Sequence, residues 1–297
     1  MARRSRVRRG LPSAVVAVLV VALTVAVGGL VALALQRGQG TPVADRSADP
    51  VPATTPSPSP SASAAPSVSA APTAIAAPGA AERFLAAGDD VIWRAIAGSC
   101  GTTAPVVERS DDAGETWDDV TPTYRDIAQV RALTPLADTQ ATAVTDVGSD
   151  CEIQALQTFT DGAFWSPYEK VLAQSTYLEG DAVVIDGTAL AAPCAEPWGL
   201  RASGDTAAFL CGGTAYETAD GQTSRIGDGV VALDIHDGDV VAASVAPDCD
   251  GLQLTALSGD GQEIACVDAD AAAPTALALT DDAIWLWNAD ELTSTPR

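Results

Sequence analysis

The stretch that decides the fold is Ser110-Asp111-Asp112-Ala113-Gly114-Glu115-Thr116-Trp117. It fits the pattern Ser-x-Asp-x-Gly-x-Thr-Trp at every fixed position. Asp112 and Gly114 favour a chain reversal, and the side-chain oxygens of Ser110 and Asp112 can accept hydrogen bonds from backbone N–H groups of the turn. Trp117 follows at the base of the hairpin. The octapeptide therefore predicts two short antiparallel strands fastened by a polar turn.

Three weaker copies of this turn follow at intervals of one small antiparallel sheet. Aligned on the turn glycine, they occupy residues 158–165, 218–223 and 258–263. The four copies resemble the Asp-box, or BNR, repeats of the sialidase-like β-propellers, although only the first copy is complete. The resemblance implies a propeller and a structural role for the box residues Ser110, Asp112, Gly114, Thr116, Trp117, Gly162 and Trp165.

A second repeated element runs apolar residues into a turn containing aspartate and out again. It occurs at residues 84–93, 231–241 and 276–285, with looser copies around Asp138, Asp181 and Asp205. Each copy predicts a short hairpin. The whole unit is about four strands in roughly 40 to 60 residues, the size of a propeller blade. We therefore expect an all-β fold, a small propeller of four or five blades with five preferred, or alternatively a β-sandwich.

The first 35 residues have the pattern of a membrane anchor. Residues 1–13 contain five arginines and no acid, and residues 14–35 are an uncharged run of Ala, Val, Leu and Gly with one Thr. About twenty such residues span a hydrocarbon core of roughly 30 Å, and arginines before the span place the N-terminus in the cytoplasm. We expect an uncleaved anchor in the cell membrane with the bulk of the chain extracellular. A cleaved signal peptide is the alternative.

Two further zones follow the apolar run. Residues 36–80 are rich in Pro, Ser, Ala and Thr and predict an extended, disordered stalk. Residues 81–297 are long enough for one domain, and they contain 9 basic and 37 acidic residues, a formal charge of −28. A field of that sign repels nucleic acid, so no nucleic-acid partner is expected. An extracellular glycan or an envelope protein is the candidate partner.

All six cysteines lie beyond the predicted anchor, which indicates disulfides formed in an oxidising compartment. Two pairs share a C-x16-C spacing around a predicted turn, so that their members can meet across a hairpin. The remaining two cysteines would join neighbouring repeats if all six are paired. The predicted disulfides are Cys194–Cys211, Cys249–Cys266 and Cys100–Cys151.

The resemblance to sialidases implies an arginine cluster that grips a carboxylate, a tyrosine nucleophile with a glutamate, and an aspartate acid. Those enzymes also begin with an arginine-isoleucine-proline strand motif, and the corresponding strand here reads Glu82-Arg83-Phe84-Leu85-Ala86. The motif is absent, so we assign no catalytic residue. His236 is the only histidine, and turn acids such as Asp237 and Asp239 do not form a calcium loop. No metal or cofactor is expected.

These observations predict a non-catalytic recognition or scaffold module. The alternative is an exo-sialidase or another glycoside hydrolase acting on extracellular glycans, because two well-placed carboxylates suffice for that chemistry. Trp198, in a loop beside Pro197 and Gly199, is the candidate ligand contact. A central funnel plugged by Val and Ala would favour binding, whereas three converging arginines beside a Tyr–Glu pair would favour a sialidase.

Overall fold

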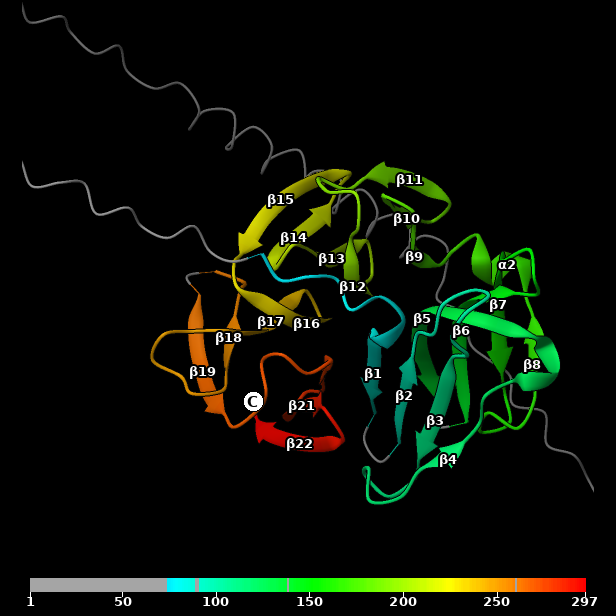
Figure 1. Ribbon diagram of the computed structural model, residues 1–297, viewed down its shortest axis with the longest axis horizontal. Helices are drawn as coiled ribbons and strands as arrows, with labels where there is room; N and C mark the ends of the chain where they lie inside the picture. The colour runs from blue at the N-terminus through cyan, green and yellow to red at the C-terminus, as the bar shows by residue number, and fades with distance from the viewer. Residues whose placement is uncertain (1–73, 89–90, 138, 260) are drawn as a thin grey trace, which may run out of the picture. The chain divides into compact units, whose positions relative to one another are not determined.

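A computed structural model describes residues 74–88, 91–137, 139–259 and 261–297, which belong to one compact unit (Figure 1). The predicted tail, the predicted anchor and most of the predicted stalk lie outside the described residues. Among the residues that are described, no helix has the length and apolar character that crossing a membrane requires.

The described chain is almost wholly strand, arranged in six antiparallel sheets. The first two sheets contain β1 (Arg83–Ala87), β2 (Ile92–Ile96), β3 (Val106–Ser110) and β4 (Asp118–Asp119), then β5 (Ile127–Ala137), β6 (Gln140–Val147), β7 (Glu152–Thr158) and β8 (Trp165–Pro167). The third contains β9 (Thr176–Glu179), β10 (Ala182–Ile185) and β11 (Thr188–Ala191). The fourth contains β12 (Trp198–Ser203), β13 (Thr206–Cys211), β14 (Thr214–Ala219) and β15 (Gln222–Gly227). The last two contain β16 (Val230–His236), β17 (Asp239–Ser244), β18 (Leu252–Ala256) and β19 (Gln262–Val267), then β20 (Thr275–Leu279), β21 (Ala283–Asn288) and β22 (Glu291–Pro296).

Three short helices accompany these strands in the described part of the chain. They are η1 (Gly79–Ala81) before the first sheet, η2 (Thr123–Arg125) between the first and second sheets, and α2 (Glu169–Leu172) between the second and third.

The six sheets form a closed ring, visible as successive colours around Figure 1. The first strand of each sheet contacts the first strand of the next sheet, and β20 of the last sheet contacts β1 of the first. The protein is therefore a six-bladed propeller. The prediction of four or five blades was wrong, and the ring also replaces the alternative β-sandwich. The first strand, β1, and the last strand, β22, lie in adjacent blades that share no strand.

The predicted number of blades was too low because two blades have only three strands. All four turn motifs occupy one topological position, the connection between the third and fourth strands of a four-stranded blade. Blades three and six lack a fourth strand and so lack the motif. The second repeated element covers the first hairpin of every blade, including the three looser copies. Its six copies match the blade number, whereas the four turn motifs do not.

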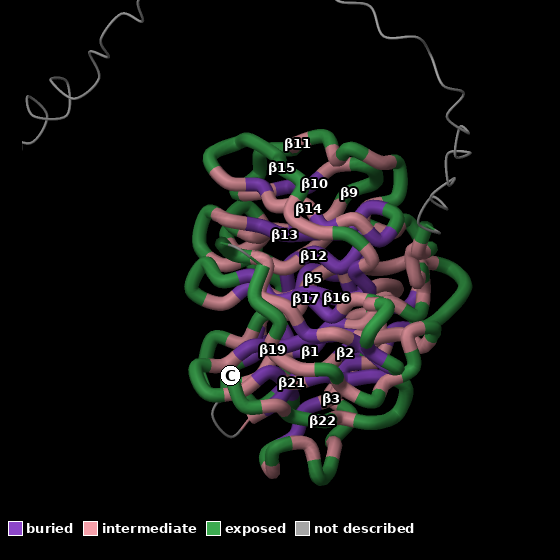
Figure 2. Tube along the Cα trace, turned by 90° about the vertical axis from the view of Figure 1, so that its left-hand side faces the viewer, coloured by how far each residue is buried: buried purple, intermediate pink, exposed green. Residues whose placement is uncertain are grey.

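Apolar side chains fill the spaces between neighbouring blades. Figure 2 marks the buried segments of the chain, which lie mainly along the strands. Trp93 of blade one and Trp165 of blade two are fully buried and pack edge to face with ring centroids 6.0 Å apart. At the seam between blades one and six, Leu85 and Ile92 pack against Trp287 and the small residues of β20. The first strand of each blade is its inner strand, and β16 and β20 bury four consecutive residues each, 230–233 and 276–279, because both faces of these inner strands are covered.

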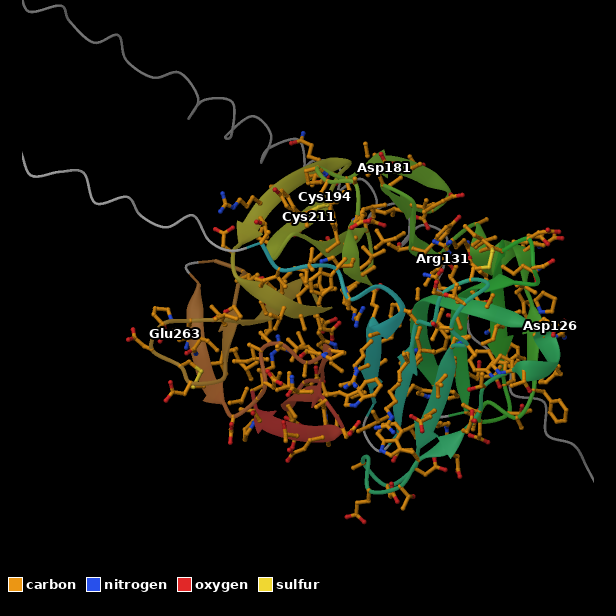
Figure 3. The ribbon with its side chains drawn as sticks, in the orientation of Figure 1. Asp126, Arg131, Asp181, Cys194, Cys211 and Glu263 are labelled. Carbon is orange, nitrogen blue, oxygen red and sulfur yellow. A yellow bond between two sulfur atoms is a disulfide. The ribbon has the colours of Figure 1, made fainter. Side chains whose placement is uncertain are left out.

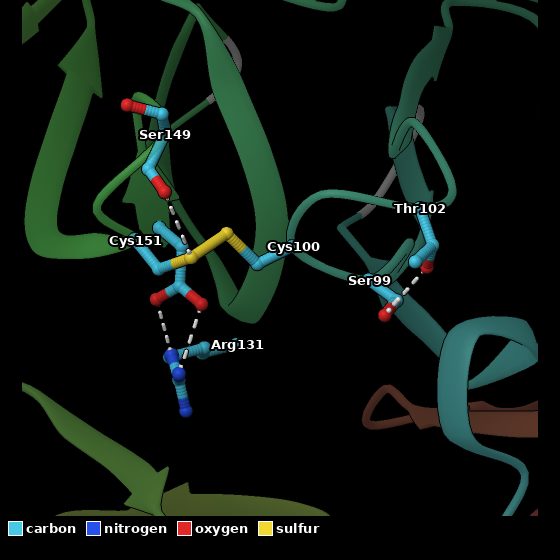
Figure 4. Close-up of a disulfide and its surroundings, with 7 residues drawn as sticks. Ser99, Cys100, Thr102, Arg131, Ser149 and Cys151 are labelled. Carbon is cyan, nitrogen blue, oxygen red and sulfur yellow. Dashed lines mark hydrogen bonds and ion pairs between the residues drawn. A yellow bond between two sulfur atoms is a disulfide. The ribbon is translucent and has the colours of Figure 1, made fainter.

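The three predicted disulfides are present, with Cα–Cα distances of 5.7 to 6.1 Å. Cys100 follows β2 and Cys151 precedes β7, so this bond joins blade one to blade two (Figure 4). Cys194–Cys211, labelled in Figure 3, and Cys249–Cys266 each close a loop within one blade.

Candidate functional site

The first turn motif is held by its own side chains. Ser110 Oγ accepts a hydrogen bond from the Gly114 N–H at 2.8 Å and donates to Asp112 Oδ1 at 2.7 Å. Asp112 in turn accepts from the side-chain hydroxyl of Thr116 at 2.6 Å and from its backbone N–H at 2.8 Å. The Thr116 hydroxyl and N–H, followed by the Ser110 hydroxyl, lower the pKa of Asp112 to about 2. These contacts give the motif a local structural role.

The second turn motif uses the same hydrogen bonds with different residues. Thr158 Oγ1 accepts from the Gly162 N–H at 3.1 Å, as Ser110 does from Gly114. Thr160 Oγ1 accepts from the Phe164 N–H at 3.0 Å, in the place of Asp112. Gly162 adopts a φ of +84°, and a Cβ there would lie 2.6 Å from Val120 Cβ. The fourth copy differs, because Ser258 Oγ accepts from Val240 N of the neighbouring hairpin.

The functional candidates lie at the ring axis, away from these turns. Inner strands β5 and β12 carry register shifts between Val130 and Ala132 and between Trp198 and Arg201. A β-bulge re-aims the side chains beside it. At the second bulge Gly199 has a φ of +65°, and its N–H donates to Glu82 Oε1 at 2.8 Å. Arg131 lies within the first bulge and Arg201 directly follows the second.

Arg201 lies between two carboxyl groups, Glu82 and Asp234. Its Nη1 and Nη2 donate to the Leu200 and Arg83 carbonyls at 2.8 and 3.0 Å. Its Nε lies 3.9 Å from Asp234 Oδ1, too far for a hydrogen bond. Burial raises the pKa of Glu82. Burial likewise raises the pKa of Asp234 to about 6, against the opposing effect of Arg201.

Arg131 has its own acid within the same blade. Its Nε and Nη2 donate to the two oxygens of Asp146 at 2.5 and 2.9 Å, and its Nη1 donates to the Leu178 carbonyl at 2.8 Å. Arg131 is labelled in Figure 3, between the second and third blades. Tyr177 is adjacent, but it packs against Val144 and Val184 and its pKa is raised by burial.

The described residues enclose a larger and a smaller cavity at the axis. The larger, of about 520 Å³, is lined by the later residues of the inner strands, including Phe84, Leu133, Leu200, Asp234 and His236, and by the polar Thr134, Thr142, Gln157, Gln174, Ser175 and Thr176. The smaller, of about 280 Å³, is lined by Glu82, Arg83 and Trp198, by the segment 75–81 and by the loop 271–275. Arg201 lines both cavities.

The sequence suggested two alternatives for the axis, a plug of Val and Ala or three converging arginines beside a Tyr–Glu pair. The described axis has neither arrangement. Val and Ala alone do not fill the axis of the described part of the chain, because the charged Glu82, Arg201 and Asp234 line its two cavities. Converging free arginines are absent from the described axis as well, because Arg131 and Arg201 are engaged by acids and carbonyl groups. Tyr177 lines neither of the two cavities.

The predicted ligand contact, Trp198, is 6% exposed and lines the smaller cavity, where it packs in the core between blades four and five. Its role as a ligand contact stays a prediction. His236 lies at the larger cavity, and its Nε2 is 3.0 Å from Asp281 Oδ1 and 4.0 Å from Asp237 Oδ2. These two acids are 88% exposed, so the trio is a solvated surface cluster.

Sequence reasoning missed the charged residues of the axis, although one signal marked them. Arg131, Arg201 and Asp234 each stand alone within an otherwise uncharged inner strand. An isolated charge in an apolar strand has to find a partner on another strand, because burying an unpaired charge is costly.

Comparisons with known proteins match no family model and no curated protein. Among solved structures, YCF48 bound to a D1 peptide is 15% identical with a TM-score of 0.38, and the match covers 75% of this chain and 80% of that chain. Regucalcin, a calcium-binding protein from Agrobacterium tumefaciens, is 12% identical with a TM-score of 0.45, covering 72% and 84%. A Hadza microbial sialidase is 10% identical with a TM-score of 0.36, covering 72% and 51%. These likenesses are too distant to indicate a function.

Proposed function

We propose that this chain is a surface-tethered, non-catalytic binding module, in which an N-terminal anchor holds an extracellular propeller and the larger axial cavity receives the ligand. The positions of the carboxylates in the two axial cavities favour ligand binding over glycoside hydrolysis. Among the described lining residues, Asp234 is the only carboxylate of the larger cavity and Glu82 the only one of the smaller. Glycoside hydrolysis generally needs two carboxyl groups about 5 to 9.5 Å apart around one bond. Acids that line separate cavities do not meet that need.

The arginines favour the same conclusion. A sialidase-type pocket needs guanidinium groups that are free to grip a carboxylate. Arg131 is held by Asp146 in a two-bond pair, and the terminal nitrogens of Arg201 are held by backbone carbonyls. Arg83 lies 4.1 Å from the centroid of the Trp287 ring and donates to the Ala289 carbonyl. An anionic sugar would therefore have to displace existing contacts and enter a domain of formal charge −28.

The location outside the cell is supported by the apolar run at residues 14–35, by the arginines that precede it and by three disulfides. Protease treatment of intact cells tests it. We expect release of fragments of the propeller while a cytosolic marker protein stays intact. A propeller that is cut only after the cells are lysed would contradict the proposed location.

A glycoside hydrolase remains the second candidate because of Asp234. Its raised pKa of about 6 leaves part of the population protonated near neutral pH, which suits a general acid. The test is a panel of fluorogenic sialosides and neutral glycosides, applied between pH 5 and 7 to the full-length protein and to Asp234→Asn and Glu82→Gln. We expect no turnover above the blank. Turnover that either substitution abolishes would defeat the binding-module proposal.

A further inference from the structure

We infer that the larger cavity binds an organic cation, a primary ammonium group on an apolar stem, with the ammonium at the carboxylate of Asp234. This inference rests on the proposed function, because it names the ligand class of the same cavity.

The first observation is that Asp234 lacks a close cationic partner. The nearest guanidinium atom, Arg201 Nε, is 3.9 Å from Oδ1, and Nε makes no hydrogen bond among the described residues. The other oxygen, Oδ2, accepts from the backbone N–H of Leu279 at 2.7 Å. The backbone N–H groups of Leu279 and Ile235 are neutral donors, and the ion pair with Arg201 is loose, so the charge of the carboxylate is poorly compensated. Hydrogen bonds from a charged donor are stronger than those from a neutral one. An ammonium group would supply them.

The second observation is the balance of charge around the axis. Arg83 of the smaller cavity is balanced by Asp290. Beside that pair, Glu82, Asp146 and Asp234 provide three acids for two arginines, Arg131 and Arg201. With all five ionised, the cluster keeps one negative charge. The acidic domain around it adds a field of the same sign, which concentrates cations and excludes anions at a concave surface.

The third observation is the wall of the cavity. Its volume of about 520 Å³ is within the usual range for small-molecule pockets. The side chain of Asp234 is 16% exposed, and that surface faces this cavity. Apart from Asp234, Arg201 and His236, the described lining residues are uncharged, and Phe84, Leu133 and Val144 provide apolar wall. Such a surface suits a stem that carries no second charge.

The inference predicts that binding of the organic cation weakens as the pH falls, because the Asp234 carboxylate becomes protonated. The titratable side chains that face the cavity are Asp234 and His236 from β16 and Arg201 from β12, while β1, β5 and β20 contribute none to its described lining. Protonation of Asp234 removes the anion that the ligand needs. With the pKa of Asp234 at about 6, its ionised fraction falls about tenfold between pH 8 and pH 5.

Titration calorimetry with the full-length protein in mild detergent tests this inference. The probes are phenethylamine, its neutral counterpart 2-phenylethanol and the anionic 3-phenylpropanoate. We expect phenethylamine to bind at pH 8, to bind at least fivefold more weakly at pH 5, and to bind at least tenfold more tightly than either control probe.

Two substitutions complete the test. Asp234→Asn keeps an oxygen that can accept from the Leu279 N–H but removes the charge, and we expect it to weaken phenethylamine binding at least tenfold. Asp220→Asn removes the same charge from an exposed turn with a φ of +52°, outside both cavities, and we expect no change. The melting temperature of each variant shows that it is folded.

Equal binding of the alcohol and the amine, or amine binding that survives Asp234→Asn, would overturn the cation assignment while leaving the proposed binding role intact. Absence of amine binding at pH 8 would also overturn it. Failure of the proposed function has a separate signature, the glycoside turnover described above.

Discussion

The hydroxyl of Thr158 offers a sharp test of how the turn motifs stabilise the propeller. Thr158 is fully buried, and its Oγ1 accepts hydrogen bonds from Gly162 N at 3.1 Å and from Thr160 N at 3.2 Å. Thr158→Val keeps the shape and the strand preference of the side chain but leaves the buried Gly162 N–H without its acceptor. An unsatisfied buried donor costs about 1 to 3 kcal/mol. The free energy of unfolding should fall by that amount.

The measurement is thermal unfolding of the oxidised full-length protein, followed by near-ultraviolet circular dichroism. For a domain of this size, about 1 to 3 kcal/mol corresponds to a loss of roughly 2 to 10 °C in melting temperature. Two matched variants set the scale. Thr158→Ser keeps the hydroxyl and should lose less than Thr158→Val. Thr160→Val removes an exposed hydroxyl that water can replace, and it should change the melting temperature by less than about 2 °C. Equal losses for Thr158→Val and Thr160→Val would refute the argument.

Three further predictions concern the disulfides, a turn glycine and the axis. Replacing Cys100 and Cys151 by serine opens a loop with a sequence separation of 51 and should lower the free energy of unfolding by about 4 kcal/mol. The same change at Cys194 and Cys211, with a separation of 17, should lower it by about 3 kcal/mol. Urea unfolding measures both losses, and the reverse order would contradict the loop-length argument. Gly162→Ala should lower the melting temperature more than Gly221→Ala, because both residues have a positive φ but only at Gly162 would the new Cβ meet a neighbour, Val120. The pKa of Asp234 in the folded state, about 6, exceeds the ordinary value of 3.8, so its ionisation destabilises the fold as the pH rises from about 4 to 6. Asp234→Asn removes this ionisation and should raise the free energy of unfolding above pH 6 by up to about 3 kcal/mol. The gain should vanish below about pH 4, and a gain of the same size at pH 3 and pH 8 would rule out this cause.

The repeating parts of the fold could be predicted from the sequence because local residues determine them. Asp112 and Gly114 favour a turn wherever they occur together, and the C-x16-C spacing brings Cys194 to Cys211 across a single hairpin. The six hairpins with an aspartate turn were also recognisable, including the looser copies. These features depend on contacts between residues close in the chain, for which sequence spacing is a reliable guide.

Blade number and the axis depended on the tertiary structure. Whether a blade gains a fourth strand depends on the segment that follows its third strand. The blades β9–β11 and β20–β22 have no fourth strand. In the sequence, Glu82 lies more than a hundred residues before Arg201 and Asp234. The three residues meet only because the ring closes between β1 and β20. Closure buries their charges together, and that burial sets the pKa of Asp234 and the chemistry of the cavity that it lines. No spacing in the chain encodes such a meeting, because it depends on how all six blades pack.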